Sequence, residues 1–252
     1  MTTPAFASGK RGYLTSTRAP RYSILFALPL LVSYEGLAAL LSSPTGGFRN
    51  GADALFRGMF IALAGGRGPA LFMAAVILLG VGLVSRDMKR TREPLRLGYF
   101  AGMLVESALL AVAFGLVIGT ITAELLGAAH LLAIAAPTGI TAMSRPTRLM
   151  LSLGAGLYEE LFFRVVLVSG LTALGRAVLG LGRGTSATIA VIVSAILFSL
   201  FHYIPPYGDQ FQLASFTFRL LSGLAFSALY VTRGFGITAW THALYDAFLL
   251  LF

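Results

Sequence analysis

Seven long apolar runs dominate this sequence, and each is about as long as a lipid bilayer is thick. A helix of about 20 apolar residues crosses the roughly 30 Å hydrocarbon layer and satisfies its own backbone hydrogen bonds there. The sequence therefore predicts an all-α fold, a polytopic membrane helix bundle of about 7–8 transmembrane helices, as one integral-membrane domain over residues 1–252. The runs lie at about 23–41, 69–85, 99–123, 149–172, 186–204, 213–231 and 236–252.

Composition indicates the same fold class. Hydrophobic residues make up 57% of the chain and charged residues 12%, whereas a water-soluble domain has roughly 25% charged residues. The net charge is +9, but the basic residues stand in short clusters beside the apolar runs, as they do at the cytoplasmic ends of membrane helices. We therefore expect no nucleic-acid partner. The chain has no cysteine, which excludes disulfides, thiol nucleophiles and cysteine metal sites.

The basic clusters also predict an orientation. With seven spans and a cytoplasmic N-terminus, 12 Lys and Arg residues fall on the cytoplasmic side and five on the outer side. The apolar stretch 124–143 could form an eighth span, which would invert everything after it and change the division to 11 against six. We expect a protein integral to the plasma (inner) membrane with a cytoplasmic N-terminus. The sidedness of the second half stays open. Residues 44–67, with arginines spaced among aromatic and aliphatic residues, could form an interfacial amphipathic helix.

Three polar patterns interrupt the apolar runs of the second half. An ionisable group inside a membrane costs several kcal/mol unless it is paired or hydrated, so each one is a candidate functional residue. The patterns are Glu159-Glu160-Leu-Phe-Phe-Arg164, then Phe198-Ser-Leu-Phe-His202, then His242-Ala-Leu-Tyr-Asp246.

Helix geometry predicts different partners for the two glutamates of the first pattern. Adjacent residues of an α-helix point about 100° apart, whereas residues four apart share a face. Glu160 should therefore pair with Arg164, which keeps the carboxylate ionised and oriented. Glu159 is left without a partner in its own helix and is free to act as a general base.

The same spacing relates the residues of the other two patterns. His242 and Asp246 are four apart, so the carboxylate can orient the imidazole and fix its tautomer. Phe198 and His202 also share a face, and the phenyl ring should pack beside the imidazole.

Together the three patterns resemble the CPBP family of intramembrane proteases, which includes the type II CAAX prenyl endopeptidases, the bacterial Abi proteins and the myxosortases. The resemblance covers residues 149–252. It implies a glutamate-dependent endopeptidase in which Glu159, assisted by His202, activates a water molecule. It further implies that His242 and Asp246 stabilise the oxyanion.

The resemblance also implies that Glu160 and Arg164, with Phe198, support the site, and that no cofactor is needed. The last position of the third pattern is an aspartate. An ionised Asp246 cannot donate a hydrogen bond, whereas an asparagine at this position could. We therefore expect Asp246 to orient His242 or to be protonated.

Other chemistries remain as alternatives. Two histidines and a carboxylate suit Zn²⁺, so Glu159, His202 and His242 could hold a zinc ion, although we expect none. Two further acids, Glu35 and Glu106, fall in apolar runs and could line a cavity, bond to Arg219, or simply pack.

The predicted partner is a membrane-anchored protein or peptide, cleaved within the lipid bilayer. Its nature stays open among a prenyl-type C-terminal peptide, a C-terminal sorting helix and a bacteriocin-like peptide, as does the oligomeric state. The alternative function is a non-catalytic membrane scaffold or bacteriocin-immunity protein that keeps the protease fold. A transporter with a carboxylate proton relay is a third hypothesis, but the sequence shows no internal repeat.

Overall fold

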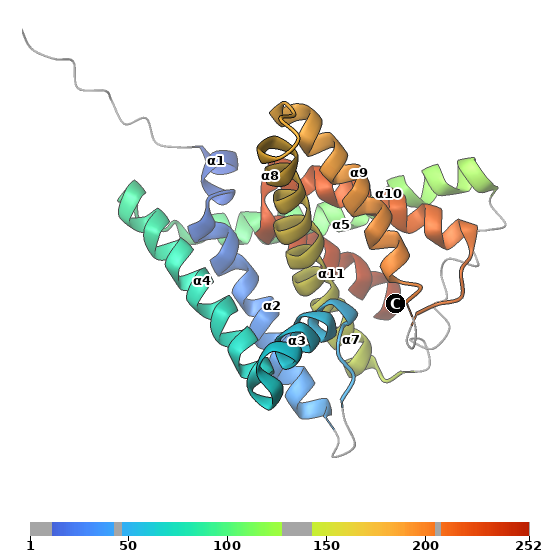
Figure 1. Ribbon diagram of the computed structural model, residues 1–252, viewed down its shortest axis with the longest axis horizontal. Helices are drawn as coiled ribbons and strands as arrows, with labels where there is room; N and C mark the ends of the chain where they lie inside the picture. Colours follow the sequence, from blue (N-terminus) through green and yellow to red (C-terminus); the bar gives the residue numbers. More distant parts are fainter. Residues whose placement is uncertain (1–11, 43–46, 128–142, 205–207, 252) are drawn as a thin grey trace, which may run out of the picture.

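The chain forms a bundle of helices, and no strand occurs in the residues that the computed structural model describes, 12–42, 47–127, 143–204 and 208–251 (Figure 1). This confirms the predicted all-α fold. The elements are α1 (Tyr13–Thr17), α2 (Pro20–Leu41), α3 (Gly51–Ala64), η1 (Gly65–Arg67), α4 (Gly68–Thr91), α5 (Leu97–Leu126), α7 (Arg145–Gly154), η3 (Ala155–Glu159), η4 (Leu161–Val168), α8 (Ser169–Ala177), α9 (Arg183–Phe201), α10 (Leu213–Arg233) and α11 (Phe235–Leu251).

All seven predicted apolar runs are helical. Within the described residues, five helical stretches are long and apolar enough to cross a membrane: α2, α3 with α4, α5, α9 and α10. The other two predicted spans are α11, which has 17 residues, and the continuous helix formed by α7, η3, η4 and α8. The predicted helix within 44–67 is present as α3, and its interfacial position remains a prediction. Most of the stretch 124–143 lies outside the described residues.

Helix α11 lies at the centre of the bundle. It packs against α2, α5, α7, α10 and η3 (Figure 1). Two glycines allow these close approaches, because a Cβ at Gly156 would lie 2.3 Å from the carbonyl oxygen of Ala239, and one at Gly236 would lie 2.4 Å from that of Ser23. The backbone of α11 therefore lies directly against the helix that carries Glu159 and Glu160.

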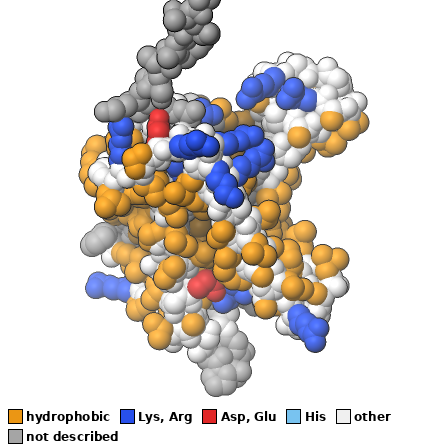
Figure 2. Space-filling model, turned by 90° about the vertical axis from the view of Figure 1, so that its left-hand side faces the viewer, with side chains coloured by type: hydrophobic (Ala, Val, Ile, Leu, Met, Phe, Trp, Pro, Cys, Tyr) orange, Lys and Arg blue, Asp and Glu red, His pale blue; other side chains and the backbone are white. Residues whose placement is uncertain are grey.

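One end of the bundle is rich in basic residues, and we call it the basic end. Arg233, which ends α10, donates to the backbone oxygen of Leu14 over 2.9 Å. Arg21 pairs with Asp87 and Glu93, which lie in and just beyond the last turns of α4. Figure 2 shows Lys and Arg side chains gathered at the upper end of one face, above a band of hydrophobic side chains.

The basic end joins the N-terminal segment to the second half of the chain. Arg18 lines the same cavity as Arg176, in the last turn of α8, and Arg183, the first residue of α9. The seven-span topology predicts this grouping, whereas the eight-span alternative puts Arg176 and Arg183 on the side opposite Arg18. The described residues therefore support the seven-span arrangement of the second half.

A second polar contact closes the basic end. The carboxylate of Glu106 pairs with Arg233 over 2.5 Å and accepts a hydrogen bond of 2.7 Å from the hydroxyl of Tyr13. Burial, together with the hydrogen bond to this carboxylate, raises the pKa of Tyr13 to about 12. The hydroxyl therefore stays protonated and able to donate at any physiological pH. A bond to Arg219 was one of the alternatives for Glu106, and it does not form, because Arg219 pairs with Asp209 at the other end of α10.

Candidate active site

The helix that carries the first polar pattern is not a regular α-helix. It is wound as a π-helix over η3 and again over η4, with Glu160 between the two segments. π-Helical turns are rare and are found frequently at functional sites. Glu159 and Glu160 are both buried, with side-chain exposures of 8% and 0%.

Glu159 is held by only one of its two carboxylate oxygens. Oε1 accepts a hydrogen bond of 2.7 Å from Nδ2 of Asn50. Oε2 is buried and has no hydrogen-bond partner among the described residues. The nearest basic group is Nε2 of His202, which lies 4.0 Å from Oε2. Glu159 therefore presents one free oxygen toward an imidazole nitrogen, as the prediction of a partner-free base required.

His202 is oriented by its own helix. Its Nδ1 lies 2.9 Å from the backbone oxygen of Phe198, and its ring packs edge-on against the Phe198 ring at 5.0 Å between centroids. The predicted packing of these two rings is confirmed. Because a carbonyl only accepts, Nδ1 carries the proton in this bond, and in the neutral ring Nε2 is left as an acceptor facing Glu159. The His202 side chain is 27% exposed.

His242 is held by a different carboxylate from the one that the sequence suggested. Its Nδ1 lies 2.7 Å from Oε1 of Glu160, which is a hydrogen bond, whereas its Nε2 lies 3.6 Å from Oδ2 of Asp246. Phe226 stacks on the imidazole at 4.4 Å. Glu160 therefore orients His242, and Asp246 stands near the opposite ring nitrogen with 25% of its side chain exposed.

The pairing of Glu160 with Arg164 is present as predicted. Nε of Arg164 lies 3.1 Å from Oε2 of Glu160, and both side chains are fully buried. The contact has ion-pair distance without hydrogen-bond alignment, since both atoms lack a hydrogen bond. The guanidinium also lies over the Phe198 ring at 4.5 Å. Glu160 thus has two duties, since it holds both Arg164 and His242.

The sequence analysis missed Asn50, which lies 109 residues before the carboxylate that it binds. Asn50 caps the N-terminus of α3, where its Oδ1 accepts from the backbone N–H of Ala52. A Cβ at Gly154 would lie 2.8 Å from Cβ of Asn50, so the glycine leaves room for Asn50 beside the helix that carries Glu159. An N-cap asparagine is visible in a sequence, but nothing there indicates which distant side chain it contacts.

A second buried cluster of charges supports Asn50, and we call it the Asp53 cluster. Asp53 pairs with Arg49 over 2.8 Å and with Arg57 over 2.7 Å. Both arginines also pair with Glu35, so the partner of Glu35 is not Arg219, which was one of the alternatives for this residue. The hydroxyl of Tyr34 donates to Asp53 and accepts from the backbone N–H of Asn50.

The residues considered for zinc do not form a ligand set. Within the described segments, no three His, Asp or Glu side chains are gathered closely enough to hold a metal ion. His242 uses Nδ1 for Glu160, and Glu159 uses Oε1 for Asn50. The expectation that the protein works without a cofactor stays a prediction.

A comparison with protein families gives the decisive match. Residues 141–248 match the Rce1-like model, described as type II CAAX prenyl endopeptidase Rce1-like. This part of the chain is similar to the CAAX protease family. The resemblance drawn from the three polar patterns is confirmed, while membership of the myxosortase branch remains a prediction. No curated protein and no solved structure matches the chain.

The CAAX protease match covers all three polar patterns and therefore the four residues predicted to be catalytic, Glu159, His202, His242 and Asp246. At the level of the family, this similarity supports a membrane-embedded peptidase with a peptide substrate. Asn50 and the Asp53 cluster lie outside the matched segment. The first half of this chain therefore contributes a hydrogen-bond donor to the candidate active site.

Proposed function

We propose that the protein is an intramembrane endopeptidase that hydrolyses a peptide bond with a water molecule activated by Glu159. The observation that carries this proposal is the free Oε2 of Glu159, buried and 4.0 Å from Nε2 of His202. One water molecule can lie about 2.8 Å from both atoms at that separation. A buried carboxylate oxygen without a partner costs stability, which a role in the reaction accounts for.

The proposed reaction begins when the water oxygen attacks the peptide carbonyl carbon. Glu159 takes one proton from the water, while His202 accepts a hydrogen bond from the other O–H and keeps the water in place. The C=O bond becomes a C–O⁻ bond, and the tetrahedral intermediate carries the negative charge. Glu159 then gives its proton to the amide nitrogen, the C–N bond breaks, and the products are a carboxylic acid and an amine.

The oxyanion would be stabilised by His242. With Nδ1 donating to Glu160, an imidazole protonated at both nitrogens presents its Nε2–H on the side of Asp246. Such a donor, held in a site with little water, stabilises developing negative charge. In this arrangement Asp246 holds the imidazole between two carboxylates and, being a carboxylate, does not itself donate to the oxyanion. Glu160 supplies the hydrogen bond that orients His242, and Asp246 adds a longer ion-pair contact of 3.6 Å.

The site opens at the end of the bundle opposite the basic end. Helix α9 begins with Arg183 at the basic end and its 19 residues end at Phe201, a rise of about 28 Å. His202 follows directly, and the chain then folds back so that the N–H of Asp209 donates to the carbonyl of His202 over 2.8 Å. Because cytoplasmic ends carry the excess of basic residues, we propose that the site opens toward the outer face.

This orientation narrows the substrate class. The substrate would be a membrane-anchored protein or peptide whose cleaved segment is presented at the outer face. A prenyl-type peptide held on the cytoplasmic side would not reach His202 or Glu159. The C-terminal sorting helix of an exported protein fits this requirement, and it is the substrate class that we favour.

Because the chain has no cysteine, single cysteines can report the orientation without any assay of activity. Gln210→Cys places a thiol near the site opening, and Leu179→Cys places one at the basic end; both positions are exposed. A membrane-impermeant maleimide should label Gln210→Cys in intact cells and Leu179→Cys only after the cells are opened. The reverse pattern would contradict the outward orientation and leave the proposed chemistry untouched.

Cleavage itself is tested by comparing new protein termini in membranes that contain the wild type or Glu159→Gln. The wild type should generate termini in membrane-anchored proteins that the variant does not. If the two membranes give the same termini under conditions where both proteins are present in equal amounts, the endopeptidase proposal fails and the non-catalytic scaffold takes its place.

A further inference from the structure

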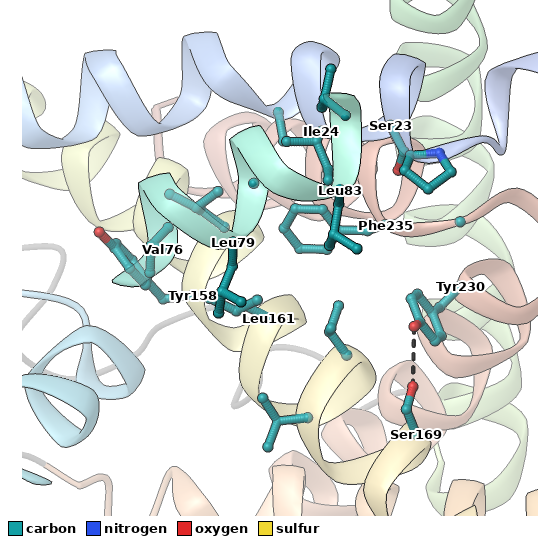
Figure 3. Close-up of a pocket in the computed structure, with 18 of the residues that line it drawn as sticks. Ser23, Ile24, Val76, Leu79, Leu83, Tyr158, Leu161, Ser169, Tyr230 and Phe235 are labelled. Atoms are coloured by element: carbon teal, nitrogen blue, oxygen red, sulfur yellow. Dashed lines mark hydrogen bonds between the residues drawn. The ribbon is translucent and has the colours of Figure 1, made fainter. Parts of the chain in front are cut away.

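A large apolar cavity lies beside the helix that carries Glu159 and Glu160 (η3 and η4), on the face that points away from these carboxylates. Its volume is about 1230 Å³, and α2, α4, η3, η4, α8 and α10 contribute to its lining. Figure 3 shows side chains of Ile24, Leu79, Leu83, Leu161 and Phe235 directed into one space between these helices. We call this space the lateral crevice.

The lateral crevice and the active site lie on opposite faces of the same helix. Leu157, Tyr158 and Leu161 line the crevice, whereas Glu159, Glu160 and the other active-site residues do not. The crevice is therefore separate from the place where a peptide bond would be cleaved. Its lining is almost wholly aliphatic and aromatic, so a flexible hydrocarbon chain is the kind of group that fits it.

Three arginines stand at one end of the lateral crevice. Arg18, Arg176 and Arg183 line it at the basic end and are exposed. Within the described part of the chain, none of the three has an ion-pair partner. Arg21 and Arg233, at the same end, are both paired with carboxylates. The crevice therefore ends in positive charge that the protein itself does not neutralise.

Polar groups that are not charged stand near these arginines. The hydroxyl groups of Ser169 and Tyr230 lie 3.2 Å apart on the crevice wall, joined by the dashed line in Figure 3. The aromatic residues Phe56, Phe60 and Phe72 line the crevice too, and they belong to α3 and to the first turns of α4, away from the arginines. Along its length the crevice changes from polar and basic to fully apolar.

We propose that the lateral crevice binds one anionic phospholipid, with its phosphate on Arg176, Arg183 and Arg18 and its acyl chain between α2, α4 and η4. Guanidinium groups bind phosphate through paired N–H donors. Basic pockets between membrane helices on the cytoplasmic side are typical sites for such headgroups. The proposal concerns a site outside the catalytic machinery and does not depend on the proposed peptidase activity.

Charge complementarity selects this occupant over others. A zwitterionic lipid would fill the apolar part equally well but would bring its own positive charge to the arginines. Free phosphate would contact the arginines but leave the apolar crevice unused. An anionic lipid satisfies both ends of the crevice at once.

The test is native mass spectrometry of the full chain in detergent, titrated with phosphatidylglycerol and with phosphatidylcholine. We expect one molecule of phosphatidylglycerol to bind per chain, at least tenfold more tightly than phosphatidylcholine. Arg176→Gln combined with Arg183→Gln should weaken the binding of phosphatidylglycerol about tenfold. The matched control, Arg67→Gln with Arg145→Gln, changes two exposed arginines that do not line the crevice and should change the affinity less than twofold.

A second variant tests the acyl-chain part independently of charge. Gly80 lines the crevice, and a Cβ there would meet only Ile24 at 3.6 Å, so Gly80→Phe should fold and fill the crevice. It should abolish the tight binding of phosphatidylglycerol. Equal binding of the two lipids, an unchanged affinity in Gly80→Phe, or full competition by inorganic phosphate would each overturn the proposal.

Discussion

Two clusters of buried charge lie side by side in this protein, and their carboxylate oxygens are hydrogen-bonded to different degrees. In the Asp53 cluster, all four carboxylate oxygens of Asp53 and Glu35 accept a hydrogen bond. The second cluster, which we call the catalytic cluster, contains Glu159, Glu160, Arg164, His202, His242 and Asp246. In it Oε2 of Glu159 accepts no hydrogen bond, and Oε2 of Glu160 has only its ion-pair contact with Arg164. Both clusters contain carboxylates and basic groups that can pair. Only in the Asp53 cluster does every carboxylate oxygen accept a hydrogen bond.

We interpret this difference as that between a structural cluster and the cluster that we propose to be catalytic. A buried charge that is fully paired holds helices in place. A buried carboxylate oxygen with no partner weakens the fold, so its presence points to chemistry. The two clusters also touch, because Asn50 hydrogen-bonds Tyr34 of the first and Glu159 of the second. The structural cluster therefore positions the functional one.

The largest expected effect is on activity in the catalytic cluster. Glu159→Gln keeps the size of the side chain but removes the base, so cleavage of a reporter substrate should fall by about 10²–10⁴-fold. Thermal stability should stay level or rise, because an unpaired buried charge is removed. Glu124→Gln is the matched control, since it changes an exposed carboxylate on α5. More than about a third of wild-type activity in Glu159→Gln would remove this residue from the mechanism.

The Asp53 cluster should show the opposite behaviour. Asp53→Asn breaks two buried ion pairs and leaves Arg49 and Arg57 only partly compensated. Breaking a buried pair costs about 3–5 kcal/mol, so the unfolding temperature in detergent should drop sharply. Activity per folded molecule should fall far less than in Glu159→Gln. A variant as stable as the wild type would show that this cluster is not structural.

Asn50 connects the clusters, and its contribution should be smaller. Asn50→Ser keeps a side chain that can cap α3 but removes the Nδ2 donor to Glu159. The loss of a hydrogen bond to a charged group is worth about 1.5–3 kcal/mol, so kcat should fall at least about tenfold with KM little changed. Asn50→Ala removes the cap as well and should also lower stability. Equal kcat in Asn50→Ser and the wild type would mean that this bond does not position Glu159.

Metal removal should have the smallest effect. If Glu159 activates water directly, strong chelators should leave the cleavage rate within about twofold of its untreated value, since general-base catalysis by a carboxylate needs no metal. Elemental analysis should find no stoichiometric zinc. Activity that is lost on chelation and restored by Zn²⁺ would overturn the mechanism.

Much of this account could be predicted from the sequence, because its strongest signals are local. Runs of apolar residues predicted seven helical segments, and four-residue spacing predicted the Glu160–Arg164 pair and the Phe198–His202 contact. The choice of Glu159 as the partner-free carboxylate also followed from spacing within one helix. These inferences needed only the geometry of a helix.

The remaining contacts depend on which helices meet, and no local pattern contains that. His242 was assigned to Asp246, four residues away, but α11 packs so closely on η3 that Glu160 is nearer. Glu106 pairs with Arg233 and Glu35 with Arg57, whereas the sequence offered only Arg219 as a possible partner. Asn50 was overlooked because its partner is 109 residues away. The π-helical winding of η3 and η4 also has no signature in the apolar pattern.

The division of labour between the two adjacent glutamates is the central claim, and one paired measurement tests it. Unfolding temperature and cleavage rate are measured on the same detergent samples of the wild type, Glu159→Gln, Glu160→Gln and Glu160→Gln with Arg164→Leu. The account predicts a stable but inactive Glu159→Gln and a destabilised Glu160→Gln. It also predicts a double variant that recovers part of the stability but not His242 orientation or activity. A fully stable Glu160→Gln, or a Glu159→Gln that unfolds, would contradict it.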